Sequence, residues 1–256
     1  MAEGDTILRT ARRIEAALGD DPVEASTPSP RGRAARVEQL DGLTLERADT
    51  RGKHLLLHFG ELVLHSHLGM SGSWHVYRRG EPWRKPSGAA WAALSTSRAE
   101  AVQFGGPTLR LLRAGALARD PVLARLGPDV LAPDFDADRI ARSLSSAPER
   151  SLGDALLDQH LVAGIGNIFK SEACFAARLD PWQQVDDLTD GQLRDVAQAA
   201  NDLMREAAEQ GRGDRAVYKR AGRPCPRCGT PIRSRGQGDA NRTTYWCPVC
   251  QPPASG

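Results

Sequence analysis

The sequence is poor in aromatic residues, has few cysteines and lacks any long apolar run. Phe, Trp and Tyr make up 5% of the 256 residues, so a compact core is possible but not one that is rich in aromatics. No apolar segment approaches the roughly 20 residues that span a membrane, and the acidic, amphipathic N-terminus is unlike a secretion signal. We therefore expect a cytoplasmic protein without a membrane partner, long enough for one large domain or two ordinary ones.

The net charge of +2 hides an uneven distribution along the chain. Residues 211–250 carry nine Lys and Arg against two Asp and Glu, a local excess of seven, which leaves the remainder about five units acidic. A basic segment of this kind favours a polyanion as the partner of the C-terminal end.

Four of the five cysteines form two CxxC pairs, Cys225/Cys228 and Cys247/Cys250, separated by eighteen residues. Two such pairs are typical of a four-thiolate site for one structural zinc ion, with no position left for substrate. Two surface disulfides are the alternative, which a reducing cytosol disfavours. A zinc ion with four protein ligands stabilises the local structure and does not react with a substrate. We therefore expect the basic side chains around the site to face a partner: Lys219, Arg227, Arg233, Arg235 and Arg242. The fifth cysteine, Cys174, falls in a helical pattern where a buried thiol is expected.

The first half of the chain predicts one helix followed by many short strands. Apolar residues recur at helical spacing over residues 5–18. Two short apolar runs, 55–57 and 62–64, flank Gly60 and predict an antiparallel hairpin. The later strand-like runs lie at 90–94, 101–104 and 109–112. The pattern favours a β-sandwich with helices at its edge, and it predicts nothing for the irregular segment 26–36.

The second half changes to helical spacing after residue 129. We expect helices at 136–144, from Ser151 to about 160, from Asn167 as a cap to about 177, and from a capping box at Thr189 to 211.

The predicted fold class is therefore α+β with two domains and a boundary near residue 130. We divide the chain into an N-terminal β-sandwich domain at 1–130, a helical domain at 131–211 and a zinc-finger hairpin at 212–256. A binding site is expected between the two halves.

A glycine-containing turn between two of these helices is a candidate phosphate site. Gly164 and Gly166 let the backbone approach a ligand closely, and the helix that starts near Asn167 presents its first amides to an anion. An ordinary helical hairpin is the alternative. The basic segment downstream makes DNA phosphate the preferred interpretation.

Six motifs, spread over nearly the whole chain, occur in a fixed order: Met1–Thr6, Arg51–His54, His67–Gly72, Leu126–Asp129, Ala163–Asn167 and Asn241–Gln251. In this combination the chain resembles the formamidopyrimidine-DNA glycosylase and endonuclease VIII family of base excision repair enzymes. The resemblance implies a β-sandwich, a helix-two-turn-helix domain and a zinc finger, with damaged DNA held between the halves. It also implies a monomeric, bifunctional DNA glycosylase and abasic-site lyase that removes oxidised bases.

The N-terminal amine is the candidate nucleophile. A glycosylase-lyase attacks the sugar carbon that bears the damaged base with an amine, and the resulting imine permits strand cleavage. An α-amino group has a pKa of about 7.7–8.0, so a useful fraction is neutral at physiological pH. The family removes the initiator Met and uses an N-terminal proline, whereas Ala2 stands here. Alanine is small enough for Met1 to be removed, and its amine can still form an imine; retained Met1 would place the amine one residue too far out.

Two other interpretations follow from the same residues. A family member that binds DNA lesions with weakened or lost lyase activity is the first, because Ala2 replaces the usual proline. A zinc-ribbon nucleic-acid binder with an unrelated N-terminal half is the remote second.

Proton transfer is assigned by the resemblance to Glu3 and Lys53. Glu3 follows the candidate nucleophile directly and would protonate the opening sugar ring; an acid that only stabilises the helix N-terminus is the alternative. Lys53 lies in a turn before an apolar strand and would act as phosphate ligand and acid, the alternative being a solvated turn lysine.

DNA contacts are assigned by the resemblance to Met70, Asn167 and Arg242. Base removal requires the nucleotide to leave the stack, and Met70 on its glycine-flanked turn matches the residue that fills the gap; a core methionine is the alternative. Asn167 and Arg242 match a pair that contacts the phosphate backbone. His65 and His67 share a strand face and could bind metal, but a structural or phosphate-contacting role is preferred.

One difference from the family's motifs indicates to which branch of the family the chain is more similar. The 8-oxoguanine branch carries an Asp-Pro-Arg-Arg-Phe-Gly stretch, and the counterpart at 106–111 lacks the first arginine and the aromatic. The endonuclease VIII branch, which acts on oxidised pyrimidines, is therefore the better match, although Met70 within His-Leu-Gly-Met resembles the other branch.

Overall fold

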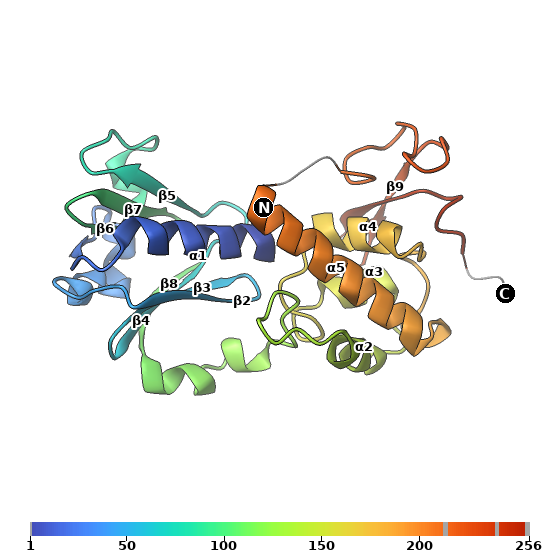
Figure 1. Cartoon of the computed structure of the whole chain (residues 1–256), viewed down its shortest axis with the longest axis horizontal. Helices are drawn as coiled ribbons and strands as arrows, with labels where there is room; N and C mark the ends of the chain where they lie inside the picture. The colour runs from blue at the N-terminus through green and yellow to red at the C-terminus, as the bar shows by residue number, and fades with distance from the viewer. Residues whose placement is uncertain (1, 212–214, 239–240, 254–256) are drawn as a thin grey trace. The chain divides into compact units, whose positions relative to one another are not determined.

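Contacts between residues divide the chain into two units, Met1–Ala124 and Arg125–Gly256. The computed structural model describes residues 2–211, 215–238 and 241–253. The first unit contains the predicted strands, and the second contains most of the helices and the cysteine-rich hairpin (Figure 1). The α+β fold class is confirmed, and the three-domain division stays a prediction.

Unit 1 contains two four-stranded antiparallel sheets. The first sheet has the order β2 (Arg47–Arg51), β3 (His54–Phe59), β4 (Leu62–His67), β8 (Thr108–Arg113). The second has the order β1 (Glu24–Ser26), β6 (Ala90–Ser95), β7 (Ala99–Phe104), β5 (Ser73–Arg78). The hairpin predicted around Gly60 is confirmed as β3 and β4, and Gly60 takes a φ of 56°, which glycine adopts without strain.

The core of unit 1 is formed by residues of both sheets and of helix α1 (Gly4–Leu18), which runs beside strands of both sheets (Figure 1). Ile7, Ala11, Ile14 and Leu18 form one fully buried stripe because they recur every three or four residues. All six residues of β3 are buried, so both faces of this strand are covered. One face of β3 therefore packs into the apolar core, and the other can carry buried polar side chains.

Short helical turns complete unit 1. They are η1 (Pro30–Ala35), η2 (Val37–Leu40), η3 (Ser87–Ala89), η4 (Ala114–Arg119) and η5 (Leu123–Arg125). The irregular segment 26–36 contains η1, and Gly32 lets it lie against β6, since a Cβ there would meet the Trp91 carbonyl oxygen at 2.0 Å. This close approach explains why a glycine is needed in a segment for which the sequence predicted no structure.

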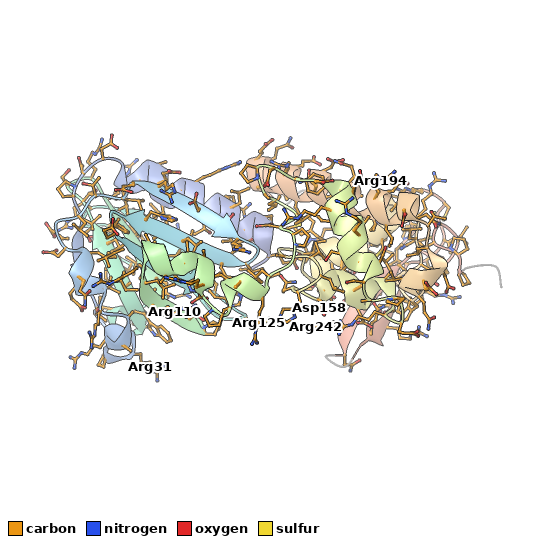
Figure 2. All side chains as sticks on the ribbon, turned by 90° about the horizontal axis from the view of Figure 1, so that it is seen from below. Arg31, Arg110, Arg125, Asp158, Arg194 and Arg242 are labelled. Carbon is orange, nitrogen blue, oxygen red and sulfur yellow. The ribbon has the colours of Figure 1, made fainter. Side chains whose placement is uncertain are left out.

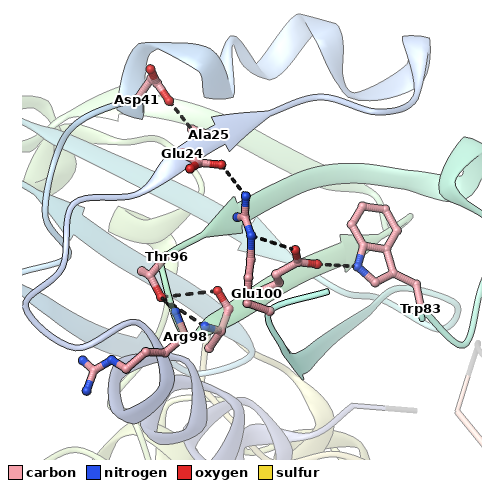
Figure 3. Close-up of polar contacts among 9 residues, drawn as sticks. Glu24, Ala25, Asp41, Trp83, Thr96, Arg98 and Glu100 are labelled. Atoms are coloured by element: carbon pink, nitrogen blue, oxygen red, sulfur yellow. Dashed lines mark hydrogen bonds and ion pairs between the residues drawn. The ribbon is translucent and has the colours of Figure 1, made fainter. Parts of the chain in front are cut away.

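Charged side chains tie the edges of the second sheet together (Figure 3). The Arg79 guanidinium lies 2.6 Å from the Glu24 carboxylate on β1 and 3.7 Å from that of Glu100 on β7. Trp83 Nε1 donates to Glu100 at 2.7 Å, and the Ala25 amide donates to Asp41 at 2.9 Å. Because the Glu24 side chain is exposed, its ion pair contributes little to stability, and we regard these contacts as fixing the edge strand in place.

Unit 2 contains four helices and a hairpin among its described residues. They are α2 (Ala137–Ser145), α3 (Leu152–Leu157), α4 (Asn167–Ala176), α5 (Asp190–Gln210), β9 (Arg233–Gln237) and β10 (Arg242–Trp246), with the turn η6 (Val185–Asp187) before α5. The capping box predicted at Thr189 is confirmed, since its hydroxyl accepts from the Gln192 amide while the Gln192 side chain accepts from the Thr189 amide.

Two sequence predictions for unit 2 are wrong in detail. The helix from Ser151 ends at Leu157 rather than near 160, because the Asp158 side chain accepts from the His160 amide and takes the chain into a turn. Asn167 is the first helical residue rather than the cap; Gly166 occupies the cap position, and the Asn167 side chain bonds elsewhere.

Among the residues that the structure describes, no helix combines the length and the apolar character needed to cross a membrane.

Candidate functional site

The candidate nucleophile and acid lie at the start of α1. Glu3 is fully buried at the N-cap position, and its carbonyl oxygen accepts from the amides of Thr6 and Ile7 at 2.9 and 3.1 Å. Ala2 is half-buried and packs against the apolar core of unit 1. The positive end of a helix dipole stabilises a carboxylate at this place. Met1, on which the predicted exposure of the Ala2 amine depends, lies outside the described residues.

Lys53 lies in the tight turn between β2 and β3, where Gly52 takes a φ of 58°. The side chain is half-buried, so it is not a freely solvated lysine. Its charge acts on His67: burial lowers the pKa of His67 first, and the Lys53 ammonium lowers that pKa further. Lys53 therefore lies close to His67, which pairs with His54 across the hairpin.

Met70 lies on the turn after β4, at the same end of the sheet. The residue is 65% exposed, so the core alternative is wrong. The turn is held closely against the segment 105–107: a Cβ on Gly69 would meet Pro107 at 2.8 Å, and one on Gly72 would meet Gly106 at 2.9 Å. This packing presents Met70 to solvent from a backbone with little room to move. The sheet thus brings Lys53, His67 and Met70 to one end.

The outer face of the first sheet carries a buried polar cluster that the sequence analysis missed. His54 joins His65 and His67 there, with Arg110 and Asp120 beside them. The alternation of His65 and His67 in the strand was the only sequence signal for it. In the described part of the chain these histidines do not form a metal-binding group, so the metal interpretation has no support.

Asn167 is held by the hairpin of unit 2. Its Nδ2 donates to the Thr243 carbonyl at 2.8 Å, while its Oδ1 is buried without a hydrogen-bond partner. An amide nitrogen carries two N–H groups, and the Thr243 carbonyl accepts from one of them. Gly164, with a φ of 101°, and Gly166 form the turn that leads to this residue, as the sequence predicted.

A buried lysine fixes the hairpin to α4. Lys170, one turn after Asn167, is fully buried and donates to Thr244 Oγ1 and, at 3.4 Å, to Gln237 Oε1. Gln237 Nε2 in turn donates to Ser151 Oγ at 2.9 Å, which ties α3 to the same network. Arg242 pairs directly with Gln237 across the hairpin. Asn167 and Arg242 are therefore held in one rigid arrangement within unit 2.

Arg242 lines a pocket of about 400 Å³ together with Asp158, and both are labelled in Figure 2. Arg150, another wall residue, forms an ion pair with Asp158 at 2.9 Å. The pocket also contains Glu149 and Asp154, so Arg242 adds positive charge to walls that are otherwise largely acidic.

The Arg227 side chain makes contacts within unit 2. Its guanidinium lies 4.1 Å from the centre of the Phe175 ring and donates to the carbonyl oxygens of Phe175 and Ala176. These carbonyls end α4, where a cation is favoured by the helix dipole. Arg235 likewise stacks on Trp182, 4.4 Å from its ring centre. Part of the basic excess thus serves the fold of unit 2.

The four cysteines of the two CxxC pairs converge on one point. Their Sγ atoms all lie within 4.8 Å of one another, with 3.4 Å between Cys228 and Cys247 and 3.9 Å between Cys225 and Cys250. A tetrahedron with Zn–S bonds of about 2.3 Å needs Sγ atoms roughly 3.8 Å apart, so the site fits zinc. All four are free thiols, so the disulfide alternative is wrong. Cys174 is also free and fully buried, as expected, and burial raises the pKa of its thiol to about 12.

Three family models match successive parts of the chain. The formamidopyrimidine-DNA glycosylase N-terminal domain matches residues 1–107, and the H2TH domain of the same glycosylase matches residues 126–218. The zinc finger found in FPG and IleRS matches residues 222–253. With the geometry of the four cysteines, the last match identifies one structural zinc ion.

Similar proteins cover nearly the whole chain. A probable endonuclease 8 2 of Streptomyces coelicolor is 40% identical over 98% of this chain and 94% of its own length. A DNA-(apurinic or apyrimidinic site) lyase Nei2 of Mycolicibacterium smegmatis is 38% identical over 98% of this chain and 99% of its own. The crystal structure of MutM (Fpg) from Thermus thermophilus superposes with a TM-score of 0.81 at 30% identity, covering 99% of this chain and all of that one. Fpg of Lactococcus lactis in complex with DNA has the same fold, with a TM-score of 0.83 at 22% identity over 98% of this chain and all of that one.

We predict that Cys247→Ala abolishes stoichiometric zinc binding, because three thiolates leave the tetrahedral site open and Cys247 is fully buried at its centre. Metal analysis of the purified chain should give one zinc per wild-type molecule and much less than one for the variant. Cys174→Ala is the matched control, since it removes a buried thiol that is not a ligand and should retain one zinc. Full zinc content in Cys247→Ala would contradict the assignment.

Proposed function

Because this chain belongs to the formamidopyrimidine-DNA glycosylase and endonuclease VIII family, we propose that it is a bifunctional DNA glycosylase and abasic-site lyase of base excision repair that removes oxidised pyrimidines. The observation that carries the proposal is the start of α1, where half-buried Ala2 directly precedes fully buried Glu3. A nucleophile and an acid are thereby held next to each other by a helix that is itself anchored in the core.

The reaction begins with the amine of Ala2 after loss of Met1. Its lone pair forms a bond to C1′ of the damaged nucleotide while the bond from C1′ to the base breaks. The first product is an aminal at C1′. When its bond from C1′ to the ring oxygen breaks and that oxygen takes a proton, the product is an iminium, which withdraws electrons from the sugar and makes a C2′ proton acidic. Loss of that proton expels the 3′ phosphate and cuts the strand.

Proton transfers fall to Glu3 and Lys53. Glu3 gives a proton to the sugar ring oxygen as the ring opens, and burial beside the first turn of α1 keeps it in place. Lys53 holds a phosphate near the lesion, because its half-buried stem and the strand that follows limit where its ammonium can go. Both residues belong to unit 1.

DNA binding uses residues of both units. Met70 is exposed on a closely packed turn and takes the place of the extruded nucleotide in the stack. Asn167 and Arg242 donate to backbone phosphates, and the network of Lys170 and Gln237 holds them at a fixed spacing. Such contacts position DNA without reading its sequence.

The preference for oxidised pyrimidines rests on two observations. The two relatives described above carry names of the endonuclease 8 group. In addition, Arg110, the arginine that remains in the altered stretch, donates to His65 at 3.0 Å and to Asp120 at 2.8 Å. An arginine bound on both sides within the protein is not available to fill the gap left by a purine.

The proposal includes action as a monomer on DNA, in the cytoplasm where the DNA of the bacterial relatives lies. The lesion-binding alternative, without lyase activity, is less favoured because a relative 38% identical over nearly its full length is named as a lyase.

We predict that the purified protein forms a covalent adduct with abasic-site DNA in the presence of borohydride, since reduction fixes the imine of the Ala2 amine. Intact-mass measurement must first show that Met1 is absent. Ala2→Pro should also be trapped, whereas Ala2→Gln, which favours retention of Met1, should not. DNA binding without an adduct, in a chain that lacks Met1, would favour the lesion-binding alternative.

We predict that Glu3→Gln lowers the rate of base release from DNA with an oxidised pyrimidine by about 10²-fold or more, the usual contribution of a positioned acid. Single-turnover base release is the measurement, with thermal unfolding to show that the buried substitution is tolerated. Glu15→Gln, on the exposed face of α1, is the control and should leave the rate unchanged. Normal base release in Glu3→Gln would remove Glu3 from the mechanism.

We predict that Arg242→Ala weakens DNA binding equally for all sequences and reduces the slope of log K against log salt by about 0.9, the value for one lost phosphate contact. Affinities for an abasic-site analogue at several salt concentrations give this slope. Arg194→Ala is the control, because Arg194 is exposed but bound to Asp138 at 2.6 Å (Figure 2). An unchanged slope in Arg242→Ala would exclude a phosphate contact.

A further inference from the structure

Five polar residues form a continuous row on the outer face of the first sheet. In order they are His67, His54, His65, Arg110 and Asp120, and we call them the polar row. His67 pairs with His54 across β3 and β4, and His65 pairs with Arg110 across β4 and β8. Figure 2 labels Arg110 next to the η4 turn, after which Asp120 follows in the chain.

Along the polar row the hydrogen bonds are donated in one direction, from Arg110 to His65 and from His65 to His54. Arg110 Nε can only donate, and it donates to His65 Nδ1 at 3.0 Å. Neutral His65 must then carry its proton on Nε2, which lies 2.8 Å from His54 Nδ1. His54 accepts at Nδ1 and so carries its own proton on Nε2. Asp120 fixes the start of this sequence, because its carboxylate accepts from Arg110 Nη2 at 2.8 Å.

Two histidines of the polar row, His54 and His65, are uncharged over the physiological range. Burial lowers the pKa of His54 to about 3, with the charges of His67, His65 and Arg110 acting in the same direction and that of Asp120 against it. Burial likewise lowers the pKa of His65 to about 4, where Arg110 and His67 lower it further and Asp120 raises it. The low exposure of the row, 9% for His54 and none for His65, agrees with these directions.

The open end of the polar row lies at the Lys53 turn. His54 directly follows Lys53, and its ring centre is 4.5 Å from that of His67, on which the Lys53 charge acts. Arg51 pairs with His54 from the neighbouring strand β2. The charged and titratable groups recorded around His54 and His65 are Arg51 from β2, His67 from β4, Arg110 from β8 and Asp120, while Lys53 acts on His67. A protonated His54 would therefore add a cation against His67, the residue on which the Lys53 charge acts.

We propose that the polar row is a positioning device for Lys53. By fixing His54 in one tautomer and without charge next to the turn, it keeps the Lys53 ammonium where it meets a DNA phosphate, an inference that rests on the proposed role of Lys53. His54, His65, Arg110 and Asp120 are positioning residues in this arrangement, since none of them needs to touch DNA. Arg110 is the element that sets the direction, because only a guanidinium offers fork-like donors to His65 and Asp120 at once.

The direction of the polar row is tested by NMR of the ¹⁵N-labelled, zinc-loaded full chain. Long-range correlations between ring protons and ring nitrogens distinguish the two neutral tautomers, and single His→Gln variants assign the signals. His54 and His65 should both carry the proton on Nε2 and should not titrate between pH 5 and pH 8. A proton on Nδ1 of either residue, or an ordinary pKa near 6.5, would overturn the inference.

The role toward Lys53 is tested by two variants with opposite expected signs. Arg110→Gln removes a charge that lowers the pKa of both histidines, whereas Asp120→Asn removes one that raises it. The acid limb of single-turnover cleavage of abasic-site DNA also contains the Ala2 amine, so it is compared with that of wild type. It should move up in Arg110→Gln and should not move up in Asp120→Asn. At pH 5.5 the DNA affinity of Arg110→Gln should equal or exceed that of wild type, because a protonated imidazole attracts phosphate while it displaces Lys53.

His65→Gln is the rescue variant. Its amide can accept from Arg110 and donate to His54 without titrating, so its pH profile should match wild type with a rate within about threefold. Arg113→Gln, which changes an exposed arginine on the same strand, controls for charge alone. Equal losses of rate and affinity in Arg110→Gln and Asp120→Asn, with no change in pH profile, would show a merely structural role and overturn the proposal. Failure of wild type to cleave DNA would reject the proposed function, and the NMR result with the affinity at pH 5.5 would still decide on the polar row.

Discussion

The register in which β3 pairs with β4 is the constraint on which the candidate site of unit 1 depends. Six residue pairs, from His54 with His67 to Phe59 with Leu62, set this register, and the two-residue loop at Gly60 closes it. A slip by one residue would turn the buried leucines outward and bring the histidines into the apolar core. The same pairing places the Lys53 turn and the Met70 turn at one end of the sheet. Core packing and site geometry are therefore specified together.

In unit 2, the two-stranded hairpin has little core of its own, so contacts with the rest of the unit must hold it in place. Zinc fixes the hairpin near one end through Cys247, and the buried network of Lys170, Gln237 and Thr244 fixes it against α4. A buried ammonium is costly unless it is fully hydrogen-bonded, so this network specifies one arrangement at the expense of stability. Arg242, opposite Gln237, is positioned by both attachments. Because the hairpin is already held in place, it does not have to become ordered for Arg242 to contact a phosphate when DNA binds.

Local patterns in the sequence predicted the hairpin at Gly60, the capping box at Thr189 and the cysteine site, because each depends on residues close together in the chain or on strict ligand chemistry. The polar row could not be predicted, since it forms only when β8 adds to β4 after some forty intervening residues. The hydrogen bond of Asn167 could not be predicted from the sequence for a different reason. Its side chain is suited to cap a helix, yet a carbonyl of the distant hairpin binds it instead. The roles of Glu3, Lys53 and Met70 came from resemblance, and the structure adds burial and neighbours that resemblance alone could not supply.

Alanine in place of proline changes what the rest of the site must do. A secondary amine gives an iminium that has no proton to lose and stays charged, whereas the imine of a primary amine becomes neutral when it loses its proton. Only the charged form withdraws enough electron density for C2′ to be deprotonated. With Ala2, the lyase step therefore depends on a proton that proline would not need. In the proposed mechanism Glu3, which is fully buried at the start of α1, is the adjacent group that supplies this proton. In the proposed mechanism, replacing proline by alanine therefore makes the lyase step depend on the carboxyl group of Glu3 as well as on the amine.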